Sequence, residues 1–356
     1  MSLSAILEFP ETTVDCSKAS KIERGIIKMV QKIRPDWSKV DIILQRFESE
    51  LGCLIYGAYT TKRSEMIMTK VVPDAKNAGD LNQEITSMRL FASRFFGPRA
   101  LSAFRNGFTY EYSSGVPLNY PLAIDPKVFP MVAYKIGVMH QEMSKHVVSV
   151  RGGHVFNSIR RWMKQVPLRL ADPAQNSKMN QELPSKASLE RELLELESDL
   201  NQPLVNRIVY CHGDLKPSNI IYEVNTETIQ FINMECAGPN FQAYEIAQHF
   251  IHFNSSDLER VGYDEFVPAK EFQRRWLAFY LSGFKDVPLV QVSPNEVESL
   301  LDNVQKFVLV VLLQEVVWAL TRLDTFYYPD FDLLQYGILR FKQYHRNKYN
   351  ILNIII

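Results

Sequence analysis

The sequence predicts an α+β protein of two lobes, a small N-terminal lobe built around a sheet and a larger, mainly helical C-terminal lobe. The chain has 356 residues, of which 46% are hydrophobic. A chain above ~250–300 residues normally divides its core. Apolar and polar residues alternate in pieces between residues 42 and 72, as in strands, whereas helical segments dominate later. We therefore place the lobes at residues 1–113 and 114–356.

Apolar residues at helical spacing predict the helices of both lobes. The first is amphipathic, runs from Ile22 to Ile33 and ends before Pro35. Further helices are predicted at residues 81–93, 130–143, 189–200, 272–284 and 294–323. The polar, Pro-rich residues 166–188 predict a surface loop, and the apolar tail 351–356 predicts a frayed end or an edge strand.

Short β-rich runs bounded by Asn, Gly and Pro predict the strands. One hairpin spans residues 103–112 and turns at Asn106-Gly107. Three more strands are predicted at residues 208–210, 220–222 and 229–232. The polar residues between these three runs therefore lie on loops at strand ends.

The charge composition argues against a nucleic-acid partner. Forty basic residues balance forty acidic residues, so no global field attracts the protein to nucleic acid or to an anionic membrane. The longest uninterrupted apolar run, residues 307–313, is well under the ~20 residues that span a bilayer. We expect no membrane insertion.

The cysteines indicate a reducing compartment. Cys16, Cys53, Cys211 and Cys236 are far apart and form no C-x-x-C pattern, which argues against a zinc site and a disulfide framework. The N-terminus has no basic region of the kind that opens a signal peptide. We expect a cytoplasmic protein.

The loop after residues 208–210 carries the pattern that points to a reaction. It reads HGDLKPSN, and Asp214 and Asn219 have the H-x-D-x-x-x-x-N spacing of a kinase catalytic loop. Phosphoryl transfer needs a carboxylate that orients the attacking hydroxyl, and an Asn or Asp on the metal just beyond it. An isolated His-Gly-Asp is also consistent with a solvated turn.

A second polar group, Asn233-Met234-Glu235, follows the next hairpin. Kinase folds hold Mg²⁺ at this point, and this hard cation prefers oxygen ligands. Asn219, Asn233 and Glu235 are therefore the candidate metal ligands, with ATP and Mg²⁺ as the expected cofactors. Asn233 and Glu235 lie on one face if the strand continues through them.

These motifs resemble those of the choline/ethanolamine kinase family. HGDLKPSNIIY, followed by FINMECAGPNFQAYEIAQHF, is similar to the family pattern H-N-D-L-x-x-x-N-I, then I-D-[FY]-E-Y-A and [FY]-D-I-x-N-H-F. The ethanolamine branch is the nearer match, and the resemblance covers residues 22–344. It implies a bilobal, protein-kinase-like fold and ATP-dependent phosphorylation of ethanolamine, with choline as the second candidate. That reaction opens the route to phosphatidylethanolamine, and a homodimer is left open.

The resemblance also assigns the nucleotide-binding residues. Lys70 holds the α- and β-phosphates, and Glu84 on the following helix fixes the position of that lysine. Glu111 and Tyr112 are hinge candidates whose backbone groups meet the adenine. Taken alone, Lys70 and Glu84 would be surface charges and Tyr112 a core residue.

A cationic alkylammonium group gains from aromatic faces and nearby acids, and the resemblance assigns such a pocket. Trp318 aligns with one of the family's two tryptophans, whereas the other falls on Glu315. The tyrosine after the family's D-x-E glutamate is Cys236 here, and a further family glutamate falls on His252. His249, three residues before His252, is expected to be a hydrogen-bonding histidine rather than a metal ligand.

Two departures from the family pattern bear on catalysis. The first Asp of D-x-E is Asn233, a neutral ligand that should weaken Mg²⁺ binding. The family's phosphate loop, G-[IG]-[TS]-N, falls on residues 46–49, where Glu48 adds repulsion and the nearest glycine, Gly52, is displaced.

The departures leave three functions open. The first is an active ethanolamine kinase with Asp214, Asn219, Lys70 and Glu84 in place. The second is a catalytically impaired paralogue that keeps the fold as a binding or regulatory module. The third, a protein or aminoglycoside kinase, fits least well because the Tyr244–Phe250 segment resembles the choline/ethanolamine family.

Overall fold

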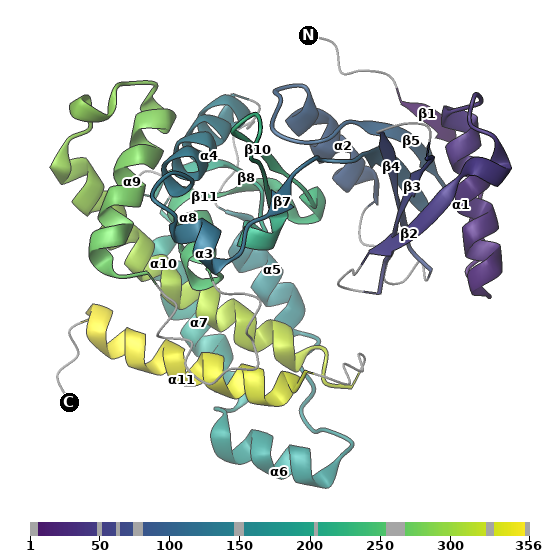
Figure 1. Cartoon of the computed structure of the whole chain (residues 1–356). Coiled ribbons are helices and arrows are strands. Elements are labelled where there is room, and N and C mark those ends of the chain that lie inside the picture. Colours follow the sequence, from purple (N-terminus) through teal and green to yellow (C-terminus); the bar gives the residue numbers. More distant parts are fainter. Residues whose placement is uncertain are drawn as a thin grey trace. The chain divides into compact units, whose positions relative to one another are not determined.

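The computed structural model describes residues 6–47, 52–61, 65–73, 81–145, 153–202, 206–253, 268–324 and 331–352 (Figure 1). Contacts divide the chain into two units. Unit 1 comprises Met1–Pro117 and Asn219–Ala237, and unit 2 comprises Leu118–Ser218 and Gly238–Ile356. The prediction placed all of residues 114–356 in one lobe. Residues 219–237 instead contact unit 1, because β7 (Val116–Pro117) pairs with β9 (Ile220–Glu223).

A six-stranded sheet forms the centre of unit 1. Its strands are β1 (Leu7–Phe9), β2 (Ile43–Phe47), β3 (Leu54–Tyr59), β4 (Met66–Val71), β5 (Ala100–Phe104) and β6 (Gly107–Glu111). They lie in the order β1-β5-β6-β4-β3-β2, and every neighbouring pair is antiparallel except β1 with β5. The strands predicted between residues 42 and 72 and the hairpin at 103–112 are confirmed.

The β5–β6 hairpin turns at Arg105-Asn106, one residue earlier than predicted. Gly107 begins β6 instead, and a Cβ atom there would lie 2.1 Å from the carbonyl oxygen of Lys70. Glycine therefore allows β6 to approach β4 closely. The Asn106 side chain accepts a hydrogen bond from the Val14 amide at 2.9 Å and donates to the carbonyls of Val14 and Val72 at 3.0 and 3.4 Å.

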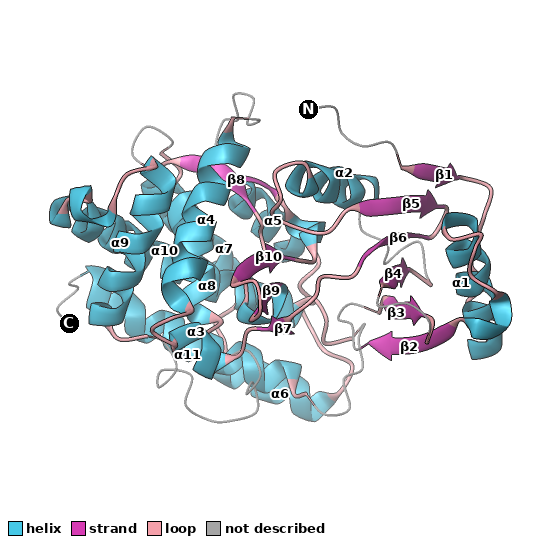
Figure 2. Cartoon of the chain, turned by 45° about the horizontal axis from the view of Figure 1, so that its top comes forward, coloured by secondary structure: helices cyan, strands magenta, loops and turns pink. Residues whose placement is uncertain are grey.

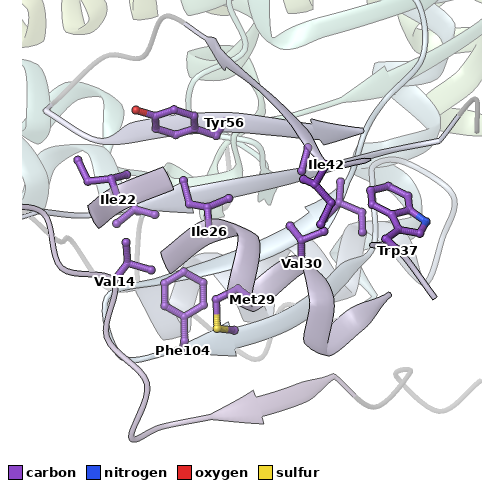
Figure 3. Close-up of a cluster of buried hydrophobic side chains, with 12 residues drawn as sticks. Val14, Ile22, Ile26, Met29, Val30, Trp37, Ile42, Tyr56 and Phe104 are labelled. Atoms are coloured by element: carbon purple, nitrogen blue, oxygen red, sulfur yellow. The ribbon is translucent and has the colours of Figure 1, made fainter. Parts of the chain in front are cut away.

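Helix α1 (Ala19–Ile33) covers one face of this sheet, and its apolar stripe forms the core of unit 1 (Figure 3). It ends before Pro35, because a residue that precedes proline is disfavoured in helical conformation. The buried members of this cluster are Val14, Ile22, Ile26, Met29, Val30, Trp37, Ile42, Tyr56, Ala58, Ile67, Val71 and Phe104. The predicted amphipathic helix is confirmed, with a packing role.

The hairpin of β9 and β10 (Thr228–Phe231), with β7 at its edge, forms a second sheet in unit 1. It contacts the segment after α2 (Leu81–Ala92), where the Phe231 amide donates to the Phe96 carbonyl at 2.7 Å. The chain then enters the short 3₁₀ helix η4 (Met234–Cys236). This contact places the predicted Asn233-Met234-Glu235 group beside α2, which carries Glu84.

Unit 2 is mainly helical (Figure 2). Its described residues contain one small sheet, β8 (Ile208–Cys211) antiparallel to β11 (Gly238–Phe241). Its helices are α3 (Tyr120–Ile124), α4 (Phe129–Ser144), α5 (His154–Met163), α6 (Pro173–Glu182), α7 (Lys186–Leu200), α8 (Gln242–Ile251), α9 (Lys270–Lys285), α10 (Pro294–Leu320) and α11 (Leu333–Leu352). All predicted helices are confirmed. Helix α4 packs along α9, and α10 packs against α8 and α11.

Helix α10 is the central helix of unit 2. It is long and apolar enough to cross a membrane by length and composition, a property that the count of uninterrupted apolar residues missed. However, 67% of its most apolar 18-residue window is buried inside the protein. This burial is what a core helix of a folded domain requires.

Two predictions at the level of elements are wrong. The expected loop at residues 166–188 contains α6, which begins with Pro173 after the N-cap Asp172, whose side chain accepts from the Gln175 amide at 2.8 Å. A proline at the first helical position is favourable. Ile351 and Leu352, assigned to the tail, continue α11, and residues 353–356 lie outside the described residues.

The hydrogen bonds of the Asn106 side chain make a testable contribution to stability. Asn106→Ala should lower the free energy of unfolding by about 1–3 kcal/mol, because it leaves the Val14 amide without its acceptor. Urea denaturation of the intact protein measures this change. Asn225→Ala, in the exposed β9–β10 turn, is the matched control and should have a much smaller effect. Equal midpoints for both variants would contradict this role of Asn106.

Candidate active site

Lys70, on the inner strand β4, lies in a buried ion pair with Glu84 of α2. The Lys70 Nζ atom is 2.9 Å from both carboxylate oxygens of Glu84. Both side chains are almost fully buried, with 6% and 5% of their surfaces exposed. The structure thus brings together the two residues that the sequence assigned to phosphate binding.

Glu235 of η4 is a second partner of the same ammonium. Its Oε2 atom is 2.9 Å from Lys70 Nζ, and its side chain is the most exposed of the three, at 24%. Burial alone would lower the pKa of Lys70, but the charges of Glu84 and Glu235 outweigh it and raise that pKa above its ordinary value. Lys70 is therefore a permanent cation at neutral pH.

The metal-ligand candidates all belong to unit 1. The Asn219 carbonyl accepts from the Ile232 amide at 3.0 Å, which fixes Asn219 beside the residue that precedes Asn233. Asn233 has φ 68° and ψ 62°, a left-handed conformation that Asn adopts more readily than most residues. The strand does not continue through Asn233, so the condition for a shared strand face with Glu235 is not met.

These side chains fit Mg²⁺ by donor type. Two amide oxygens and one carboxylate offer the oxygen ligands that this ion prefers. Only Glu235 carries a charge, and in this structure that charge is engaged by Lys70. Asn219, Asn233 and Glu235 are thus a weak but chemically suitable ligand set.

Asp214 lies in unit 2, on the loop that follows β8. Its Oδ2 atom is 3.5 Å from the Nζ atom of Lys216, which sequence reasoning did not assign. Lys216 is buried, and Asp214 keeps 22% of its side chain exposed. The short D-L-K spacing was the available signal for this pair of opposite charges. The loop turns at Gly213, which has φ 85°.

Glu245 of α8 anchors this loop, and sequence reasoning missed it. Its carboxylate is completely buried and accepts hydrogen bonds from the backbone amides of His212 at 2.9 Å and Gly213 at 2.6 Å. His140 Nε2 lies 2.6 Å from the same carboxylate. Burial alone would raise the pKa of Glu245, but these donors hold it below its ordinary value. The sequence signal for this role of Glu245 was an acidic residue within the apolar segment of α8.

Helix α8 holds the loop at a further point. His249 Nδ1 lies 2.8 Å from the Leu215 carbonyl, and burial lowers the pKa of His249 to about 4. This histidine is therefore neutral and donates a hydrogen bond, as expected from the sequence. Cys211 lies near His140 and Glu245, within 4.8 Å, but burial raises its thiol pKa well above the ordinary value. A protonated thiol is a poor metal ligand.

Three of the four predicted amine-pocket residues meet in unit 2. His252 Nε2 is 3.3 Å from Glu315 Oε1, and the Tyr336 hydroxyl donates to the other oxygen of Glu315. Burial alone would raise the pKa of Glu315, but His252, Arg340 and Tyr336 lower it to about 2. Glu315 is thus an ionised carboxylate with internal partners.

Trp318 lies one turn further along α10 and also has an internal cation partner. The Arg322 guanidinium carbon lies 4.6 Å from the Trp318 ring centroid, and the Tyr336 ring meets it edge-on at 6.1 Å. One face of the tryptophan is therefore occupied by an arginine. Cys236, the fourth predicted residue, is exposed and lies in unit 1.

The predicted hinge residues are largely satisfied within unit 1. The Glu111 carboxylate pairs with Arg99, at 2.9 Å from its Nε atom, and this arginine holds the Glu111 pKa below its ordinary value although burial opposes it. The amides of Glu111 and Tyr112 donate to the carbonyls of Arg99 and Met66 at 3.0 and 3.3 Å. Ser113 follows, and its buried hydroxyl has no partner among the described residues.

The predicted phosphate loop, residues 46–49, is only partly described. Arg46 and Phe47 end β2, whereas Glu48 and Ser49 lie outside the described residues. Gly52 has φ 70°, a conformation that favours glycine, and a Cβ atom there would meet nothing within 4 Å.

Comparison with solved structures defines the class of fold. Choline kinase from Cryptosporidium parvum Iowa II is similar with a TM-score of 0.75 and 19% identity, covering 92% of this chain and 96% of that one. Plasmodium vivax ethanolamine kinase has the same TM-score at 18% identity, covering 94% and 91%. The choline kinase LicA of Streptococcus pneumoniae, solved with AMP, is similar at a TM-score of 0.60 and 16% identity, covering 91% and 98%. The predicted kinase-like fold is confirmed.

The sequence comparisons then give the family. The profile of the Choline/ethanolamine kinase family matches residues 53–345, and the chain belongs to this family of ATP-dependent alcohol kinases. Human Ethanolamine kinase 2 is 28% identical over 331 residues, which cover 91% of this chain and 81% of the relative. Human Ethanolamine kinase 1 is also 28% identical, over 94% of this chain and 74% of that protein.

The Glu245 anchor predicts the behaviour of the catalytic loop. In Glu245→Gln, one amide donor of the loop faces an NH₂ group and loses its acceptor, at a cost of about 1–3 kcal/mol. Amide hydrogen exchange at residues 212 and 213 should therefore accelerate by roughly 5–150-fold. Glu298→Gln, an exposed carboxylate of α10, is the control. Unchanged exchange at both amides would exclude Glu245 as the anchor.

Proposed function

We propose that this protein transfers the γ-phosphoryl group of ATP to the hydroxyl of ethanolamine. The observation that carries this proposal is the Lys70 ammonium, buried on β4 and held at 2.9 Å by Glu84 and Glu235. A cation fixed in this way suits the phosphates of a nucleotide, which phosphoryl transfer must position. The family and the free thiols of all four cysteines support a cytosolic enzyme of this kind.

Lys70 exchanges one of its partners when the nucleotide binds. Its three N–H donors are used on Glu84 and Glu235, and Glu235 is the more exposed of the two. The phosphates therefore replace Glu235, while Glu84 keeps the lysine in place. The released carboxylate, with Asn219 and Asn233, would hold Mg²⁺, which neutralises phosphate charge when bound.

Asp214 accepts a hydrogen bond from the substrate hydroxyl and orients it for attack. The hydrogen bonds from the His212 and Gly213 amides to Glu245 fix the backbone that carries the Asp214 carboxylate. The Lys216 ammonium lies 3.5 Å from Asp214 Oδ2. Its positive charge is therefore near the substrate hydroxyl that Asp214 orients, at which negative charge develops during attack.

The partners of Trp318 and Glu315 favour ethanolamine over choline as the acceptor. A quaternary ammonium depends on open aromatic faces, and Arg322 occupies one face of Trp318. A primary ammonium can instead donate hydrogen bonds to a carboxylate such as Glu315. Choline remains the second candidate because it offers the same hydroxyl.

A binding or regulatory module without catalysis is the second candidate function. The neutral side chain at Asn233 and the engagement of Glu235 by Lys70 favour it, since both lower the charge available to Mg²⁺. Such a module would use the same nucleotide-binding residues as an active kinase, and only the lack of turnover would distinguish it.

Asp214→Ala tests the proposed chemistry. Loss of the orienting carboxylate should reduce ethanolamine-dependent ADP formation by about 10²–10⁴-fold. Circular dichroism should show the fold intact, because Asp214 is a partly exposed loop residue. Asp302→Ala, on the exposed side of α10, is the control. Parental turnover in Asp214→Ala would remove this residue from the mechanism.

The acceptor preference is measured with the same assay. We expect kcat/KM for ethanolamine to exceed that for choline, since the aromatic face of Trp318 is already occupied. Arg322→Ala should narrow this difference by freeing the ring for a methylated ammonium. A parental preference for choline would refute this account of the pocket and leave the fold unaffected.

Asn233→Asp separates the two candidate functions. A charged ligand in this position should raise kcat by about 10–100-fold, or roughly 1.4–2.8 kcal/mol of barrier, with the largest gain at limiting Mg²⁺. A Mg²⁺ titration of both proteins measures it. The same half-saturating Mg²⁺ in both would show that Asn233 does not bind the metal. Two folded, nucleotide-binding but inactive proteins would favour the regulatory module.

A further inference from the structure

Unit 2 contains a groove with a volume of about 430 Å³ at the end of β8 opposite the catalytic loop. Arg207, just before β8, lines the groove, whereas His212, just after it, begins the loop. The remaining walls come from the start of α8, the end of α9 and the first turns of α10. None of its lining residues has been assigned to the phosphoryl-transfer site.

Two buried carboxamides, Asn206 and Gln242, line this groove. Asn206 is 95% buried; its Nδ2 atom donates to the Leu200 carbonyl at 2.9 Å, and its Oδ1 atom has no partner among the described residues. Gln242 is 92% buried and uses its Nε2 atom on the Tyr280 hydroxyl at 2.8 Å. Its Oε1 atom therefore remains for the groove. The Gln242 oxygen can accept from a ligand N–H or O–H group, whereas the Asn206 oxygen is enclosed by the protein and has almost no accessible surface.

The charges of the lining favour an anionic group as well. Lys285 and Glu296 neutralise each other, with Nζ 2.7 Å from Oε1. Arg207 is the remaining charged residue of the lining, and no carboxylate in the described part of the chain pairs with it. Its guanidinium lies 5.3 Å from the Phe284 ring centroid, which holds the cation at the groove. The lining thus combines one positive charge, that of Arg207, with one acceptor oxygen, that of Gln242.

A buried chain of hydrogen bonds connects Gln242 with the catalytic loop. Gln242 donates to the Tyr280 hydroxyl, which lies 2.8 Å from His140 Nδ1, and His140 Nε2 lies 2.6 Å from Glu245. Glu245 in turn accepts the amides of residues 212 and 213. Because ionised Glu245 only accepts, His140 donates to it through Nε2, and Gln242 donates to the Tyr280 hydroxyl.

We propose that this groove binds a small zwitterion, with an ammonium or hydroxyl group on the Gln242 oxygen and a phosphate or carboxylate on Arg207. Binding strengthens the donor at Gln242 and so tightens the chain that fixes the loop of Asp214. The choice of phosphoethanolamine as the probe rests on the proposed function, since it is that reaction's product and has both groups. The groove itself does not depend on that reaction.

Isothermal titration calorimetry of the full chain tests the site with phosphoethanolamine, ethanolamine and inorganic phosphate. We expect phosphoethanolamine to bind the groove about tenfold more tightly than either fragment, and Arg207→Met to weaken that binding about tenfold. Ser299→Trp should block the groove. Arg274→Met, an exposed arginine of α9 outside the groove, is the control. Parental affinity and stoichiometry in both groove variants would overturn the proposal.

Amide hydrogen exchange tests the connection to the loop. Phosphoethanolamine should slow exchange at residues 212 and 213 in the parent protein and leave it unchanged in Arg207→Met. Tyr280→Phe removes the hydroxyl that links Gln242 with His140, so it should keep ligand binding and lose this slowing. Identical slowing in Tyr280→Phe would overturn the chain. Absence of kinase turnover with intact groove binding would refute the proposed function alone.

Discussion

Unit 1 depends on one buried ammonium. Lys70 joins three segments that are distant in sequence, the strand β4, the helix α2 and the turn η4, through Glu84 and Glu235. Burying charges costs several kcal/mol per ion unless each finds a partner, and removing one partner of a buried pair typically costs about 3–5 kcal/mol. The position of Lys70, the proposed phosphate-binding cation, is therefore set by the same contacts that hold this part of the fold together.

In unit 2, the buried charge that needs partners is the negative charge of Glu245. The Glu245 carboxylate has no exposed surface and is stabilised by two loop amides and His140, which orient the loop of Asp214. A chain of donors through Tyr280 extends this network to the groove at Gln242. In both units, the fixed geometry of the proposed site residues follows from the need to satisfy a buried charge.

Local patterns in the sequence predicted much of this structure. The Asp214 to Asn219 spacing, the alternating strands around Lys70 and the helical stripe of α1 all depend on neighbours in the chain. Glu245 was missed because its role depends on contacts between distant segments. Helix α6 was missed because it is polar and has little apolar periodicity, although its Asp172-Pro173 start is a recognisable signal.

The departures from the family pattern make catalysis the central question. Asn233 lowers the charge at the metal position, and Arg322 with His252 supplies internal partners to the residues of the amine pocket. The most direct measurement is ³¹P NMR of the purified protein with ATP, Mg²⁺ and ethanolamine. The account predicts that ADP and phosphoethanolamine form in equal amounts, and that little ADP forms without the acceptor. Absence of phosphoethanolamine at saturating Mg²⁺, or ADP formation that does not depend on ethanolamine, would contradict it.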